Sequence, residues 1–284
     1  MAITDMPAAA GLAGARITWF RALRSEWIKF RSIRTSYVVL AIAVFLLIAL
    51  GALISFGFVE GLRQGDREAA AASAFLGAVT ITLNGTLLAQ IAIGVFGVLV
   101  VTSEYSTGMI RATFAAAPNR LMVLVAKAVL IVLVTIAIMA PAAFATFAIG
   151  KSILAGQIDA SWSDPGVIRA VFGASLYLAG IGVLGAGLGW ILRSAAGAIA
   201  TLIGVLAVLP PLIGIIPVEW VQTLSDYLPS TAGRAIYSVN TGGLLSEIDP
   251  TQPSLDPWVG FGILCAYTLA VLGVGAVLLQ RKDA

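Results

Sequence analysis

Residues 37–59 read YVVLAIAVFLLIALGALISFGFV, a stretch without one charged side chain. The hydrocarbon core of a bilayer is about 30 Å thick, and a helix needs about 20 apolar residues to cross it. Because lipid offers the backbone no hydrogen-bond partners, a run of this length must be helical rather than an open strand. We therefore expect residues 37–59 to cross a membrane as one helix.

Five further runs of this kind follow along the chain. The predicted spans are residues 37–59, 75–101, 121–149, 167–192, 195–216 and 258–279. The 284 residues are 60% hydrophobic and 11% charged, with a mean hydropathy of +1.00, whereas a soluble domain is about 45–50% apolar and about 25% charged. We predict an all-α membrane protein, with residues 1–36 as a cytoplasmic N-terminus and 37–284 as a six-helix transmembrane domain.

The distribution of Lys and Arg predicts the orientation. Cytoplasmic loops carry an excess of these residues. With both termini in the cytoplasm, twelve of the 17 Lys and Arg lie inside, and five lie outside: Arg63, Arg67, Lys151, Arg169 and Arg234. Arginine exceeds lysine and Ala and Gly are abundant, which is typical of GC-rich bacterial genomes, so we expect a multi-pass protein of the bacterial plasma membrane.

Residues 16–34, before the first span, have the pattern of an amphipathic helix. Arg21 and Lys29 fall on one side of a helical wheel. The other side carries Trp19, Phe20, Leu23, Trp27 and Phe30. Such a helix lies flat at an anionic leaflet. The alternative is a basic flank that orients the first span and has no defined fold.

Residues 217–257 form the longest predicted outer segment, with two short apolar stripes at helical spacing. They fit either short helices against the outer leaflet or an ordinary surface loop. In the fourth span, Gly185 and Gly189 form a small-xxx-small pair, which lets helix backbones approach closely. The partner helix could belong to this chain or to another.

The residue inventory argues against catalysis and against cofactors on this chain. Histidine is absent, and Ser175 in the fourth span has no lysine at membrane depth to act as its base. Gly150, Lys151 and Ser152 fit a loosened phosphate-loop pattern, but a true phosphate loop follows a strand and opens a helix. We therefore predict no catalytic residue and no metal site, and we expect Lys151 to anchor its span at the interface.

The connection between the second and third spans, residues 104–120, reads EYSTGMIRATFAAAPNR. Glu104 follows the second span, and Gly108 permits a turn. A short helix of about two turns then runs to Pro118, and Arg120 precedes the next span. We expect Glu104 to pair with Arg120 or with a cation of the N-terminal helix, the alternative being a solvated flank.

With six spans, the basic N-terminal helix and Leu-Pro-Ser-Thr-Ala-Gly at 228–233, the chain resembles the ABC-2 type permeases of ATP-binding-cassette exporters. The resemblance implies that residues 104–120 form a coupling segment that docks into a separate ATPase, braced by the N-terminal helix. The residues it assigns to this segment are Glu104, Tyr105, Gly108, Met109, Ile110, Arg111, Phe114, Pro118 and Arg120, with Met109, Ile110 and Phe114 as apolar docking residues.

The same resemblance implies the partners: two copies of the ATPase, which carry ATP and Mg, a second permease copy or a related permease, the lipid bilayer, and no nucleic acid. Apolar walls with scattered Thr, Asn and Gln suit drugs, lipids or amphipathic peptides as substrates. The alternative function is a membrane-embedded enzyme or an accessory protein without transport activity.

Overall fold

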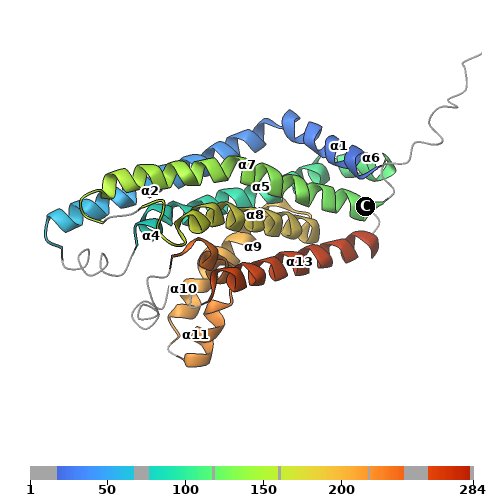
Figure 1. Ribbon diagram of the computed structural model, residues 1–284. Helices are drawn as coiled ribbons and strands as arrows, with labels where there is room; N and C mark the ends of the chain where they lie inside the picture. Colours follow the sequence, from blue (N-terminus) through green and yellow to red (C-terminus); the bar gives the residue numbers. More distant parts are fainter. Residues whose placement is uncertain are drawn as a thin grey trace, which may run out of the picture.

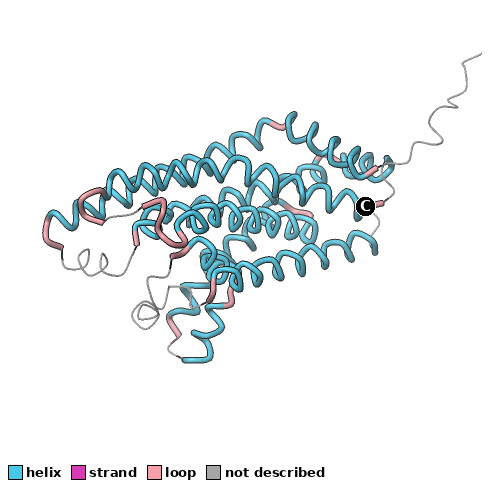
Figure 2. The backbone as a smooth tube through the Cα atoms, viewed as in Figure 1, coloured by secondary structure: helices cyan, strands magenta, loops and turns pink. Residues whose placement is uncertain are grey.

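The computed structural model describes residues 18–66, 77–116, 119–158, 161–216, 218–239 and 255–281. The described residues contain helices, turns and loops and no strand (Figure 2). Six helical segments are long and apolar enough to cross a membrane, which confirms the predicted fold class at that level.

The six spans lie where the apolar runs predict them. The first, third and fourth spans are single helices: α2 (Arg34–Arg63), α7 (Arg120–Leu154) and α8 (Val167–Leu192). Helix α7 continues through Pro141. The sixth is α13 (Pro257–Arg281). The second is built from α4 (Ala78–Thr82), η1 (Leu83–Gly85) and α5 (Thr86–Ser106), and the fifth from α9 (Ala195–Ile203), the π-helical η2 (Gly204–Val208) and α10 (Leu209–Gly214).

Helices α5 and α8 form the centre of the bundle and meet through glycines. A methyl group added to Gly97 of α5 would overlap the carbonyl oxygen of Gly182, and one added to Gly185 of α8 would overlap that of Gly94. Gly189 also faces α5, at Val98 and Val101. The small-xxx-small pair therefore packs within this chain.

The outer segment contains short helices: α11 (Glu219–Asp226), α12 (Pro229–Arg234) and η3 (Ala235–Tyr237). Ala232 and Ile236, from the second predicted stripe, are fully buried. Arg169 at the start of α8 donates from Nη1 to the Ile236 carbonyl at 2.8 Å and from Nη2 to the Ser238 carbonyl at 3.0 Å. This part of the segment thus packs on the bundle rather than on lipid, while residues 240–254 lie outside the described residues.

The ends of the bundle are distinct. Helices α1 (Trp19–Ser32) and α6 (Met109–Ala116) lie at the same end as the last turns of α13, and α4 and the last turns of α2 lie at the opposite end (Figure 1). The described part of residues 104–120 therefore lies at the α1 end of the bundle.

We expect single cysteines at Arg63 and Thr107 to label from opposite sides of the membrane. Both residues are exposed and lie at opposite ends of the bundle. In a Cys265→Ala background, Arg63→Cys should react with an impermeant maleimide on intact cells, whereas Thr107→Cys should react only after permeabilisation. Labelling of both positions from the same side would contradict the six-span topology.

Candidate functional site

Helix α1 packs on the bundle through one stripe. Ala22, Glu26 and Phe30 are buried and recur every four residues, so they share a face. Phe30 meets Phe96 of α5 edge to face, with ring centroids 6.1 Å apart. Trp19, Phe20 and Trp27 remain exposed. The structure has a helix in this stretch, from Trp19 to Ser32, with Phe30 turned toward the bundle and Trp19, Phe20 and Trp27 facing outward.

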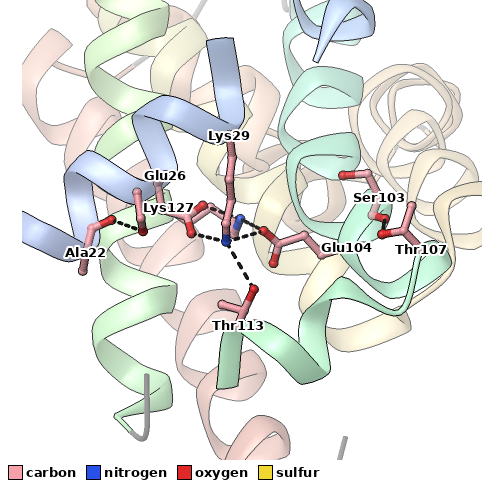
Figure 3. Close-up of polar contacts among 9 residues, drawn as sticks. Ala22, Glu26, Lys29, Ser103, Glu104, Thr107, Thr113 and Lys127 are labelled. Atoms are coloured by element: carbon pink, nitrogen blue, oxygen red, sulfur yellow. Dashed lines mark hydrogen bonds and ion pairs between the residues drawn. The ribbon is translucent and has the colours of Figure 1, made fainter. Parts of the chain in front are cut away.

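Four charged side chains meet where α1 packs on α5 and α7 (Figure 3). Lys127 Nζ of α7 lies 2.6 Å from Glu26 Oε2 of α1 and 2.9 Å from Glu104 Oε1 of α5. Lys29 Nζ of α1 lies 2.7 Å from Glu26 Oε1 and 2.9 Å from the same Glu104 oxygen. Lys29 also donates to Thr113 Oγ1 of α6 at 3.3 Å. We call Glu26, Lys29, Glu104 and Lys127 the ion-pair cluster; it joins α1, α5 and α7, and the hydrogen bond from Lys29 to Thr113 attaches α6 to it.

The ion-pair cluster is buried and electrically balanced. The side chains of Glu26, Glu104 and Lys127 are 2–3% exposed, and that of Lys29 is 24% exposed. Two cations face two anions, so no net charge is placed in the low-dielectric interior, where an unpaired charge costs several kcal/mol. The arrangement can hold helices together, although Glu104 Oε2 has no hydrogen-bond partner among the described residues.

Lys29 is the cation that α1, the helix before the spans, contributes to the cluster. Burial works to lower its pKa, but hydrogen bonds to Glu26 and Glu104 and the charges of these carboxylates outweigh burial, so the pKa lies above its usual value. A raised lysine pKa stabilises the folded state at neutral pH, and that contribution is lost only as the pH rises through the folded-state value. Lys29 is therefore cationic at neutral pH, as its ion pairs with Glu26 and Glu104 require.

The predicted coupling segment has the expected course where it is described. Gly108 has φ +70°, a left-handed conformation that glycine adopts without strain, and it separates α5 from α6. Met109 is exposed, whereas Ile110 is buried in the core and so is closed to a partner. Pro118 lies outside the described residues, as do the side chains of Arg111 and Phe114.

Both ends of the segment are fastened to the bundle. Glu104 pairs with Lys29, a cation of the N-terminal helix, and this was one of the predicted partners. Arg120 Nη1 donates to the carbonyl oxygen of Leu279 in the last turns of α13 at 2.7 Å. A solvated flank is excluded for Glu104.

Tyr105 belongs to a separate contact on the other side of α5. Its ring packs edge to face on Trp190 of α8 at 5.8 Å, and the Arg193 guanidinium lies 5.4 Å from the ring centroid. Arg193 has φ +53° in the tight turn between α8 and α9. Tyr105 thus ties the start of the coupling segment to that turn.

Sequence reasoning missed Glu26, Lys127 and Thr113 as members of the site and placed Lys29 on the outward side of α1. Two signals were available. Glu26 is the only acidic residue in the otherwise cationic stretch 16–34. Lys127 lies two turns inside an apolar span, where a charged side chain requires a partner. Thr113 carried no comparable signal.

Two observations bear on the residues that the alternative function, a membrane-embedded enzyme, would use. Ser175 is buried, and its hydroxyl donates to the carbonyl oxygen of Phe172 at 2.6 Å. Within the described ranges, no three His, Cys, Asp or Glu side chains gather where they could hold a metal ion.

Neither a scan against protein-family models nor a search of curated proteins found a match for the chain.

Proposed function

We propose that the chain is the membrane-spanning subunit of an ATP-driven exporter of the ABC-2 type, with residues 104–120 as the segment that receives a separate ATPase. It forms part of a substrate pathway and performs no covalent chemistry itself. The ATPase supplies ATP and Mg, and a second permease copy or a related permease completes the pathway.

The observation that carries the proposal is the attachment of α6 to the rest of the bundle. The helix is two turns long, follows the second span, and contacts Lys29 of α1 through Thr113. Lys29 in turn contacts Glu104, and Glu104 contacts Lys127. A force applied to α6 would reach Lys29 of α1 through this hydrogen bond, and α5 and α7 through the ion pairs beyond it, as an energy-coupling element requires.

The accessible docking residue at the start of α6 is Met109, which is 40% exposed. We expect Met109→Asp to abolish association with the ATPase and to abolish export, because a carboxylate buried in the contact without a cation costs several kcal/mol. The amount of folded chain in the membrane should stay at the wild-type level, since Met109 is not part of the core.

The experiment is affinity purification of the tagged chain from the cells that make it, with mass spectrometry for a co-purifying ATPase. Tyr227→Asp is the matched control, because Tyr227 is 44% exposed and follows α11, away from α6. Ile110 and Ile236 do not serve here, since both are buried and their substitution would unfold the chain. An ATPase retained at wild-type amounts by Met109→Asp would contradict the proposed docking site, and absence of any ATPase from the wild-type sample would contradict the function.

A further inference from the structure

A groove of about 680 Å³ runs between α1 and α7. Phe20, Arg24, Trp27 and Arg31 line it from α1. These positions fall within about 60° of one another at 100° per residue, on the side of the helix roughly opposite Glu26 and Lys29. The face of α1 that does not hold the ion-pair cluster is therefore one wall of an open groove.

The other wall is apolar and extends along the spans. Leu130, Leu133, Ala137 and Ile138 line the groove from α7. A second hollow of about 570 Å³ adjoins it, shares Tyr37 and Ile138 with it, and follows α2 as far as Ala49. The twelve-residue advance from Tyr37 to Ala49 along α2 corresponds to about 18 Å, whereas one leaflet of a hydrocarbon core is about 15 Å thick. The groove is long enough to cross one leaflet.

The charged residues that line these hollows lie at one end. Arg24 and Arg31 are the only ionisable groups among the lining residues, apart from the phenol of Tyr37. Both arginines are exposed, and neither has a hydrogen bond or ion pair with any described residue. They belong to the helix that precedes Arg34, the charged first residue of α2. The mouth of the groove therefore presents two guanidinium groups at the level where a span meets the membrane surface.

We propose that this groove binds one anionic phospholipid, with an acyl chain along α2 and α7 and the headgroup phosphate on Arg24 and Arg31. Guanidinium groups hold phosphate oxygens through paired, charge-assisted hydrogen bonds. An apolar segment of a second copy would fit the walls but would leave both cations without a countercharge. The site depends only on α2 and α7 being membrane spans and is independent of the proposed export function.

The test is native mass spectrometry of the full chain released from micelles that contain phosphatidylglycerol and phosphatidylcholine with the same acyl chains. We expect one retained phosphatidylglycerol per chain. Arg24→Gln/Arg31→Gln should weaken its retention about 25-fold, roughly fivefold for each arginine near an anionic headgroup. The matched control is Arg21→Gln/Arg34→Gln, which removes two exposed arginines of the same segment that do not line the groove.

A second pair of variants tests the apolar wall. Ala137 is exposed and lines the groove, and Ala145 is exposed on the same helix without lining it. Ala137→Phe should expel the lipid, whereas Ala145→Phe should not. Three results would each overturn the proposal: equal retention of phosphatidylcholine, an equal loss in the Arg21→Gln/Arg34→Gln control, or dimers that dissociate when Ala137 is replaced by Phe, which would show a second copy in the groove.

Discussion

Replacement of Lys127 by methionine is expected to lower the free energy of unfolding by about 3–5 kcal/mol, the usual cost of removing one partner from a buried ion pair. Lys127 bonds both Glu26 and Glu104 and is 2% exposed. Without it, two buried carboxylates share the single cation of Lys29, so the interior holds an uncompensated negative charge. The measurement is denaturant unfolding of the purified chain in detergent, followed by tryptophan fluorescence.

A second substitution separates charge imbalance from lost packing. The double variant Lys127→Met/Glu104→Gln leaves Glu26 paired with Lys29 and restores neutrality, so it should be more stable than Lys127→Met alone. Lys151→Met is the control, because Lys151 lies on the same helix outside the ion-pair cluster. If Lys127→Met lost no more stability than Lys151→Met, the cluster would not be what holds α1 in place.

Replacement of Gly97 by alanine should destabilise the bundle by about 1–3 kcal/mol, which is typical of overpacking in a well-packed interior. The added methyl group meets the backbone carbonyl of Gly182, which cannot move as a flexible side chain can. Helices α5 and α8 would have to separate, and the contacts along their whole length would loosen. The measurement is the midpoint of thermal unfolding in the same detergent.

Gly273→Ala provides the control for this prediction. Gly273 lies within α13, and nothing lies within 4 Å of a methyl group added there. Alanine is intrinsically better in helices than glycine by about 1 kcal/mol, so this variant should be unchanged or more stable. A Gly97→Ala variant that behaved like Gly273→Ala would show that α5 and α8 have room between them.

The spans were predictable because each depends on composition within one stretch of chain. A run such as 37–59 has to be helical in lipid whatever surrounds it, and α2 contains it. The short helix after Gly108 was predictable for a similar local reason, since glycine and the polar residues around it end the preceding span.

The ion-pair cluster was not predictable in the same way, because its members come from three helices and are up to 101 residues apart. A helical wheel places Lys29 opposite Trp27 and Phe20 and so assigns it to solvent. It cannot show that the bundle presents Glu104 on that side. Glu26 and Lys127 each stand out in the sequence, but only the packing of α7 against α1 shows that they are partners. Likewise, the glycine pattern of the fourth span indicates close packing but leaves the partner unspecified.

The hydrogen bond between Arg120 and Leu279 gives the connection between the second and third spans a second point of support. At one end of the connection, Glu104 contacts Lys29 of α1 and Lys127 of α7. At the other end, Arg120 contacts the last turns of α13. The described parts of the connection are therefore held at both of its ends rather than at one. A displacement at Arg120 would act on the third span, which begins there, and on the sixth span through Leu279.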